Sequence, residues 1–358
     1  MSTVVQLRAA PRDARQPARI ALLGTGTVGS AFAARYLRLR EAGIALPEVA
    51  WISNSRVQLP CDEGLLQTVE AARAAPRRDG GVPPWAEGEG LCRGDIVVDA
   101  TASERVADWH AEWLARGVHV ATANKLGGGG DLGRALAIAE ARRDGTRYGD
   151  SATVGAGLPL LRTIRALVAG GDRIHAVEGV LSGTLAWLCS RFDGSRPFSA
   201  LVREARDAGY SEPDPRVDLS GEDVRRKLLI LARTAGLPLE AHHVTVEPLL
   251  SPVLRDVASD GVDAALPSLD ADLLARLRDA GEASSRLVFV GRFDADGHAA
   301  AGLRALPATH PLCAGSGTDN RVAIWSDRYR DSPLVIQGPG AGAEVTAAAL
   351  LDDVLASV

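Results

Sequence analysis

The length, composition and charge of the chain already exclude several classes of protein. The chain has 358 residues, of which 46% are apolar and 24% are charged, and its formal net charge is −5. These values are typical of a globular protein and provide no strong field that would favour nucleic acid or an anionic membrane. Because the length suits two domains, we expect two hydrophobic cores and a small-molecule partner.

The cysteines and the first residues bear on where the protein works. Residues 1–18 lack the apolar region of a secretory signal, and we expect a flexible leader there. No run reaches the roughly 18 apolar residues that a membrane span needs. Widely spaced cysteines without CxxC spacing argue against a zinc site and a disulfide framework, and favour a reducing, cytoplasmic location. These cysteines are Cys61, Cys92, Cys189 and Cys313.

Strand-like and helix-like segments alternate from residue 19 to about 150. Short apolar segments typical of buried strands are followed by segments with apolar residues at helical spacing. Such alternation predicts a parallel sheet covered by helices, so we interpret residues 19–150 as an α/β, Rossmann-type doubly wound domain. The predicted strands cover residues 18–24, 47–55, 95–101, 118–124 and 146–152, and the predicted helices cover 30–43, 104–117 and 133–145.

The pattern changes after residue 150. A helix predicted over 158–169 is interleaved with isolated apolar strands at 175–183 and 286–294. This arrangement predicts an α+β substrate domain over residues 151–335. The last segment, 336–358, combines a glycine turn with an alanine-rich helix, and we expect it to return to the first domain.

A glycine-rich turn follows the first predicted strand and opens the first predicted helix. In such a turn the first glycine permits the tight bend, the second lets the backbone approach a pyrophosphate, and the third lets the helix pack on the strand. The N-terminus of the helix then offers free N–H donors to the phosphates. The turn GTGTVG therefore predicts a nicotinamide dinucleotide held by Gly24, Thr25, Gly26, Thr27, Val28 and Gly29.

The end of the second predicted strand bears on the choice of cofactor. An acidic residue there would accept a hydrogen bond from the 2′-hydroxyl of NAD. This chain has Asn54, Ser55 and Arg56 at that place. With no carboxylate and an arginine available for a 2′-phosphate, NADP(H) is favoured over NAD(H), although use of both stays open. The alternative is that Arg56 points into solvent.

The segment 209–233, GYSEPDPRVDLSGEDVRRKLLILAR, gathers acids in a turn-rich stretch that runs into a helix. Asp223 and Lys227 are four residues apart and so share one helical face. Most such pairs are solvated surface ion pairs. Here the helix continues as LLILA, so the lysine end is expected to enter a packed region where an ammonium needs partners. Clustered acids and a lysine suit a substrate that carries an amine and a carboxylate.

This segment resembles the signature of homoserine dehydrogenases. The resemblance is closest to the dehydrogenase half of bifunctional aspartokinase/homoserine dehydrogenases, without a kinase half or an ACT domain. It runs from about residue 20 to 350 in the family's order. The other matching segments are VVDATAS (97–103), VATANK (120–125), TVGAGLP (153–159), GVLSGTLAWL (179–188) and GPGAGAEVTA (338–347).

The resemblance implies roles for individual residues on the substrate side. Lys227 matches a lysine assigned to acid–base work or substrate binding, and Lys125 matches the second active-site lysine. Asp223 matches the acid beside the catalytic lysine. The residues that match the substrate pocket are Glu212 and Asp218, which would bind the substrate amine, together with Gly183, Thr184 and Tyr210.

On the cofactor side the resemblance adds two further groups. The loop beside the nicotinamide matches Thr101, Ala102 and Ser103, with Lys125 nearby, and the returning turn matches Gly340 and Glu344. Family members also form homodimers through the second domain, and we expect a homodimer here.

The resemblance also implies a site for Na⁺ or K⁺. Its backbone ligands would be the carbonyl groups of Val154, Ala156 and Leu158. Family members often add a carboxylate three residues before the valine, where this chain has Ser151, with Asp150 next to it. The side-chain ligand is therefore a departure from the family pattern.

The reaction that the resemblance implies interconverts L-aspartate 4-semialdehyde and L-homoserine with a nicotinamide cofactor. Dihydrodipicolinate reduction and aspartate dehydrogenation are alternative enzyme functions, but neither explains the lysine-bearing segment 209–233. A nucleotide-sensing module without turnover is the alternative outside enzymes, and it predicts no catalytic lysine. Structural roles are expected for His242, His243, His310, Cys313 and the tryptophans.

Overall fold

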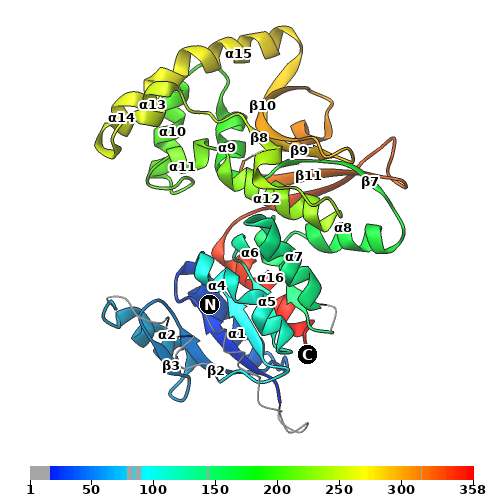
Figure 1. The fold of residues 1–358 in the computed structure, drawn as a ribbon. Helices are drawn as coiled ribbons and strands as arrows, with labels where there is room; N and C mark the ends of the chain where they lie inside the picture. Colours follow the sequence, from blue (N-terminus) through cyan, green and yellow to red (C-terminus); the bar gives the residue numbers. More distant parts are fainter. Residues whose placement is uncertain (1–16, 79–82, 84, 86–89, 143–144, 316) are drawn as a thin grey trace, which may run out of the picture. The chain divides into compact units, whose positions relative to one another are not determined.

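The computed structural model of the chain describes residues 17–78, 83, 85, 90–142, 145–315 and 317–358. The predicted leader therefore lies outside the described residues, apart from positions 17 and 18. The chain divides into two compact units, one formed by Met1–Gly157 with Gly342–Val358 and the other by Leu158–Ala341. In Figure 1 the red C-terminal helix accordingly lies among the blue and cyan elements of the first unit.

The first unit is built on a six-stranded sheet with strand order β3-β2-β1-β4-β5-β6. The pairs β1/β2, β1/β4, β4/β5 and β5/β6 are parallel, and only β3 runs antiparallel to its neighbour. This arrangement confirms the predicted Rossmann-type α/β class. The strands are β1 (Arg19–Leu23), β2 (Glu48–Ser53), β3 (Gln58–Pro60), β4 (Ile96–Asp99), β5 (His119–Thr122) and β6 (Tyr148–Gly149).

Helices cover both faces of this sheet because its central strands bury side chains on both sides. Ile20 and Leu22 of β1 belong to a core shared with α1 and α16, whereas Ala21 and Leu23 belong to a core on the other face, which includes Trp113 of α5. The helices are α1 (Thr27–Glu41), α2 (Leu65–Ala74), α4 (Glu104–Asp108), α5 (His110–Ala115), α6 (Leu126–Gly129), α7 (Leu132–Ala141) and α16 (Ala343–Leu355).

Three predictions for the first unit need correction. The helix predicted over 104–117 is broken at Trp109 into α4 and α5, where the backbone N–H of Trp109 bonds to Val106 with the shorter spacing of a 3₁₀ turn. The strand predicted over 146–152 is limited to β6 and continues as a 3₁₀ turn. The stretch 60–94, in which no helix was predicted, contains α2. The buried residues of α2, Leu65, Thr68, Val69 and Ala72, have helical spacing, so the prediction overlooked a pattern that is present in the sequence.

The second unit contains a mixed six-stranded sheet with strand order β12-β11-β7-β9-β10-β8. Its neighbouring strands are antiparallel except for β8 and β10, as expected for an α+β unit. The strands are β7 (Ile174–Val180), β8 (Val244–Val246), β9 (Ser285–Asp294), β10 (Ala299–Pro307), β11 (Asp319–Ser326) and β12 (Leu334–Pro339).

Helix α12 packs on one face of this sheet and carries the predicted lysine. It begins after Gly221, whose φ of +74° is accessible to glycine at little cost. Acids in its first turn suit the positive end of the helix dipole, and its apolar continuation is buried. The helices are α8 (Leu160–Ala169), α9 (Gly183–Arg191), α10 (Phe198–Asp207), α11 (Arg216–Leu219), α12 (Glu222–Thr234), α13 (Pro252–Asp256), α14 (Val262–Ala265) and α15 (Asp270–Glu282).

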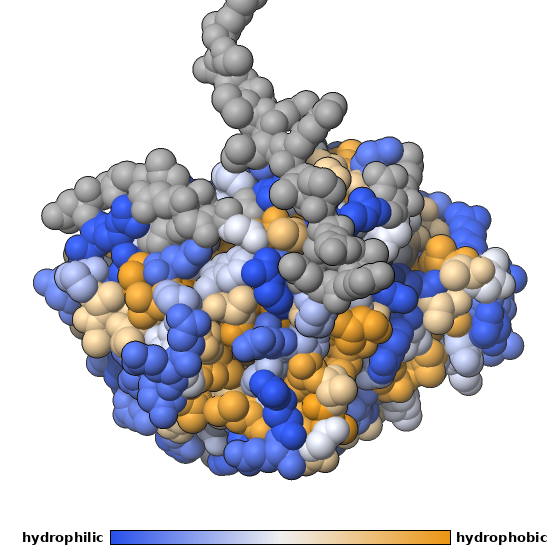
Figure 2. Space-filling view, turned by 90° about the horizontal axis from the view of Figure 1, so that it is seen from below, coloured by the Kyte–Doolittle hydropathy of each residue, from blue (hydrophilic) through white to orange (hydrophobic). Residues whose placement is uncertain are grey.

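The surface agrees with the modest net charge of the chain. Figure 2 shows hydrophilic and hydrophobic residues interspersed on the face that it draws. Among the described residues, no helix is both long enough and apolar enough to cross a bilayer.

The glycine-rich turn gives a matched pair of substitutions for a stability measurement. A Cβ at Gly29 would collide with the carbonyl oxygen of Gly24, whereas a Cβ at Gly26 would meet nothing within 4 Å. We expect Gly29→Ala to destabilise the first unit by about 1–3 kcal/mol, as overpacking typically does. Gly26→Ala should leave the melting temperature nearly unchanged. Thermal unfolding followed by circular dichroism compares the two variants. Equal melting temperatures would contradict the close approach of Gly29 to the carbonyl oxygen of Gly24.

Candidate active site

Three loops of the first unit meet at the carboxyl ends of neighbouring parallel strands, where α/β sheets bind their ligands. The glycine turn follows β1, the Thr101–Ser103 loop follows β4, and Asn124 with Lys125 follows β5. The first two loops line a cavity of about 890 Å³. Other residues of its wall include Ser53, Asn54, Ser55, Arg56, Arg73, Arg78, Trp85 and Arg105.

The glycine turn fits the pyrophosphate of a dinucleotide. Gly24 has a φ of +100°, and a Cβ there would lie 2.8 Å from the carbonyl oxygen of Ala100. Gly26 instead faces open space, and no side chain of the described residues caps the start of α1 at Thr27. The N–H groups at this helix N-terminus are therefore left for an anion. The backbone fits the cofactor that the motif predicts.

Arg56 does not point into solvent, so that alternative is wrong. Its Nη1 donates to the carbonyl oxygens of Arg73 (2.6 Å) and Ala75 (3.0 Å) at the C-terminus of α2. Asn54 fixes the same turn, because its Oδ1 accepts the backbone N–H of Arg56 (2.8 Å) while its Nδ2 donates to Thr25 Oγ1 (3.1 Å). Arg73, Arg78 and Arg105, which sequence reasoning missed, make the cavity wall strongly cationic.

In the second unit, Lys227 is buried in the way that the apolar continuation of its helix predicted. It is 6% exposed, and its Nζ lies 2.8 Å from Asp223 Oδ2 and donates to the carbonyl oxygen of Leu181 at 2.6 Å. An ammonium kept from water needs such partners. The surface ion pair typical of this spacing is therefore not what the structure shows.

The segment 181–184 connects the lysine to the clustered acids. The carbonyl oxygen of Leu181 accepts a hydrogen bond from Lys227 Nζ. Three residues later, Thr184 Oγ1 lies 2.9 Å from Asp218 Oδ1 and 2.6 Å from the carbonyl oxygen of Tyr210. Asp218 also accepts the backbone N–H of Glu212 at 2.9 Å. Gly183 begins α9 within the same segment. The predicted substrate residues of this unit are thus neighbours in space.

The acids of the segment 209–233 divide into two groups by their partners. Arg216 binds both oxygens of Asp214, at 2.7–3.1 Å, and holds the pKa of that carboxyl below its usual value. Glu222 pairs with Arg225. By contrast, the carboxyl of Glu212 is exposed to solvent. Asp218 accepts hydrogen bonds from Thr184 and from the backbone N–H of Glu212, and the binding of a substrate ammonium by Glu212 and Asp218 stays a prediction.

Asn320 is a further polar residue of this region that no motif indicated. It is 1% exposed, its Nδ2 donates to the carbonyl oxygen of Leu181 at 3.3 Å, and its Oδ1 has no hydrogen-bond partner among the described residues. Gly340 packs directly on it, since a Cβ at Gly340 would collide with the Asn320 amide. Sequence reasoning missed Asn320 because it lies at the start of an ordinary strand, β11.

Glu344 and Tyr210 have more exposed positions than the rest of the predicted set. Glu344 Oε2 pairs with Arg38 Nη2 of α1 at 2.6 Å, and both side chains are more than half exposed. This pair connects α16 to α1. Tyr210 is 48% exposed, and its ring lies 5.5 Å from that of Trp187. Their roles in binding stay predictions.

The loop predicted to hold a cation has an unusual local geometry. Ser151, the departure from the family pattern, donates from its N and Oγ to the Asp353 carboxylate of α16 at 3.0 and 2.8 Å. Ala156 has a φ of +48°, a left-handed conformation uncommon outside glycine. The carbonyl oxygen of Leu158 accepts the N–H of Leu160 at 2.8 Å. A carboxylate is therefore present beside Ser151, supplied by a distant segment, and Asp150 is buried next to it.

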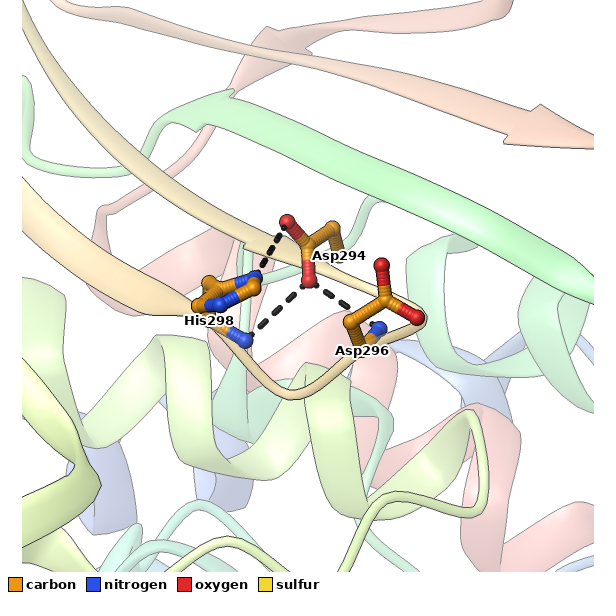
Figure 3. A group of neighbouring side chains, drawn as sticks. All are labelled: Asp294, Asp296 and His298. Carbon is orange, nitrogen blue, oxygen red and sulfur yellow. Dashed lines mark hydrogen bonds and ion pairs between the residues drawn. The ribbon is translucent and has the colours of Figure 1, made fainter.

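A second polar cluster, Asp294, Asp296 and His298, lies in the turn between β9 and β10 (Figure 3). Asp294 accepts the backbone N–H groups of Asp296 and His298 at 3.1 Å, and its other oxygen lies 3.2 Å from His298 Nδ1. Although burial opposes it, these backbone hydrogen bonds hold the pKa of Asp294 below its usual value. The requirements of a tight turn account for the cluster, and we assign it no ligand.

The residues expected to have structural roles have structural contacts. His243 Nδ1 accepts the N–H of Glu240 at 3.0 Å next to His242, and His310 Nε2 pairs with Glu178 at 3.3 Å. Cys313 is buried. Trp85, Trp109 and Trp113 contact one another in the core of the first unit.

Comparison with known proteins identifies the family. Residues 159–355 match the homoserine dehydrogenase family, and residues 24–148 match the NAD-binding domain of homoserine dehydrogenase. The homoserine dehydrogenase of Saccharomyces cerevisiae is 32% identical over 351 residues, which cover 94% of this chain and 96% of the yeast protein. A putative homoserine dehydrogenase from Archaeoglobus fulgidus superposes with a TM-score of 0.76 at 26% identity, covering 94% of this chain and 98% of that one.

Other relatives are much longer. A chloroplastic bifunctional aspartokinase/homoserine dehydrogenase from Zea mays is 40% identical over 320 residues, which cover 88% of this chain but only 34% of the maize protein. The chain thus spans about a third of that relative's length. Together, the two matched domains and the nearly full-length yeast relative show that the chain belongs to the homoserine dehydrogenase family.

Proposed function

We propose that the chain catalyses the reversible, NAD(P)H-dependent reduction of L-aspartate 4-semialdehyde to L-homoserine. The observation that carries this proposal is the buried ammonium of Lys227, held between Asp223 and the carbonyl oxygen of Leu181. A carbonyl that becomes an alkoxide needs a proton and a nearby positive charge, and a lysine supplies both. The identity of the substrate in this proposal comes from the chain's membership of the homoserine dehydrogenase family.

The residues divide the work between substrate and proton. Glu212 and Asp218 bind the substrate ammonium, while Thr184 fixes the orientation of the Asp218 carboxylate through their 2.9 Å contact. Lys227 gives a proton to the carbonyl oxygen during reduction and takes it back in the reverse direction, with Asp223 holding its ammonium. Lys125 orients the substrate. NADPH, when bound, supplies the hydride.

The role of Lys227 can be measured directly. We expect Lys227→Ala to lower kcat for homoserine-dependent NADP⁺ reduction by about 10² to 10⁴-fold, the usual contribution of a general acid or base. Absorbance at the nicotinamide band follows the reaction. Arg226→Ala is the control, because the neighbouring Arg226 is an exposed cation of the same helix. Near-full kcat in Lys227→Ala would remove the lysine from the mechanism.

We further propose that the cofactor is NADP(H) by preference, with NAD(H) accepted less well. The support is the absence of a carboxylate at residues 54–56 and the arginines of the cavity wall, Arg56 and Arg73 among them. A guanidinium is well suited to a phosphate because it donates several hydrogen bonds in a planar fork.

The arginine proposal predicts a change in selectivity. We expect Arg73→Ala and Arg56→Ala each to lower the NADP/NAD ratio of kcat/KM by about 10 to 100-fold, the value of one charge-assisted hydrogen bond. Arg73 is the more informative position, because its side chain does not hold the end of α2. The exposed Arg40 of α1 provides the control substitution Arg40→Ala. An unchanged ratio in both cavity variants would exclude these arginines from selecting the 2′-phosphate.

A monovalent cation, Na⁺ or K⁺, held by carbonyl groups of the 153–159 loop is also part of the proposal. Its support here is the Asp353 carboxylate beside Ser151, which supplies the negative charge that the family places on the loop itself. A homodimer formed by the second unit and a cytoplasmic location stay predictions.

Removing the cation tests this part of the proposal. We expect activity to fall severalfold when Na⁺ and K⁺ are replaced by choline at constant ionic strength, and to return when either ion is restored. Asp353→Asn should weaken the dependence on the ion by removing the charge. Equal activity in choline, Na⁺ and K⁺ would exclude a functional cation.

A further inference from the structure

A chain of buried polar side chains lies directly beneath the cofactor loops of the first unit. It begins at Asp99, the last residue of β4, which is 0% exposed. Asp99 Oδ1 accepts the N–H (2.9 Å) and the hydroxyl (2.7 Å) of Thr101. This carboxylate therefore holds the first residue of the loop that lines the cofactor cavity.

The second oxygen of Asp99 reaches the neighbouring loop. Asn124 Nδ2 donates to Asp99 Oδ2 at 3.0 Å and to the carbonyl oxygen of Ser103 at 2.9 Å. Asn124 Oδ1 accepts the backbone N–H of Leu126 at 3.1 Å. The backbone of Lys125 is thus fixed on both sides, and one amide connects it to the far end of the Thr101–Ser103 loop.

His110 contacts both Asp99 and Tyr148 and is the next member of this network. It is also 0% exposed, and its Nε2 lies 3.0 Å from Asp99 Oδ2 while its Nδ1 lies 3.1 Å from the hydroxyl of Tyr148. Nε2 therefore faces the Asp99 carboxylate, to which an imidazole N–H can donate a hydrogen bond. The break in the helix at Trp109 puts His110 at the start of α5, beside the strand end that bears Asp99.

The fold leaves room for this pair at one glycine. A Cβ at Gly127 in α6 would overlap the hydroxyl of Tyr148 and lie 3.0 Å from His110 Nδ1. Segments β4, α5, β6 and α6 therefore converge on a single histidine. Asp99 and His110 are not among the residues that line the cavity, so their effect is exerted through the loops that they hold.

We propose that His110, supported by Tyr148, is a positioning residue of the reaction. It fixes the Asp99 carboxylate, which sets the geometry of the Thr101–Ser103 loop and of Lys125. The inference rests on the proposed function, because these loops matter only if they hold the cofactor and the substrate. Misplacing a reacting group by about 1 Å costs about 10²-fold in rate, so this histidine should affect the reaction without touching it.

The test compares His110→Phe, which keeps a ring but removes both ring nitrogens, with His110→Gln, whose amide can still donate to Asp99. The control is His175→Phe, because His175 forms a similar pair with Asp327 at 2.8 Å on the surface of the second unit. We would measure kcat, KM, the primary isotope effect with NADPH deuterated at the transferred position, and the emission of bound NADPH.

We expect His110→Phe to lower kcat by about 10²-fold and to raise the isotope effect, because hydride transfer becomes rate-limiting. Altered emission of bound NADPH should accompany this loss, and the dissociation constant of NADPH should change little because the glycine turn is intact. His110→Gln should recover much of the loss. His175→Phe should behave as wild type.

One result would overturn the positioning role of His110. If His110→Phe shows a smaller active fraction but wild-type KM, isotope effect and emission, His110 serves stability alone and the inference is overturned. If the wild type does not oxidise homoserine, the proposed function fails instead. The emission of bound NADPH in His110→Phe then still decides whether the histidine positions the loop.

Discussion

A positive charge kept from water, the ammonium of Lys227, is the constraint on which the second unit depends. It requires acceptors on several sides, and the fold supplies Asp223 one turn earlier on the same helix and the carbonyl oxygen of Leu181 from the connection between β7 and α9. That carbonyl also accepts from Asn320 of β11. Lys227 of α12 and Asn320 of β11, which are distant in sequence, thus share one carbonyl acceptor. The same segment, 181–184, also contacts Asp218 through Thr184, so the buried ammonium and a carboxylate of the acidic segment are held by one stretch of backbone.

In the first unit, the corresponding constraint is the relative position of the loops that line the cavity. Its loops leave the carboxyl ends of three adjacent strands and must keep their relative positions while facing an open cavity. A buried carboxylate, Asp99, does this from inside the sheet. Because it is fully desolvated, it is tolerated only with the donors that surround it, and those donors come from both loops and from His110. The buried carboxylate and its donors therefore connect the two loops that follow β4 and β5.

Much of this organisation could be predicted from the sequence, and the exceptions have a physical pattern. The central strands of the first sheet, the glycine turn and the buried position of Lys227 follow from local periodicity and from the apolar run after the lysine. What periodicity could not show are contacts between distant segments. Examples are Arg56 at the end of α2, Asn320 under Gly340, and Asp353 beside Ser151. The break at Trp109 is another feature that periodicity could not show. The sequence from 104 to 117 has a good helix pattern, and the contact between His110 and Asp99 appears only in the structure.

The path of the chain through the two units has a consequence for how the protein is made. Residues 158–341 interrupt the first unit, whose core is completed by Ala347, Leu350, Leu351 and Val354 of α16. During synthesis the strands of the sheet and the helices α1 and α2 precede the second unit, so this core lacks the contribution of α16 until the second unit has been made. The first unit is therefore completed only after the second unit that interrupts it, and until then the apolar residues that α16 covers lack that partner.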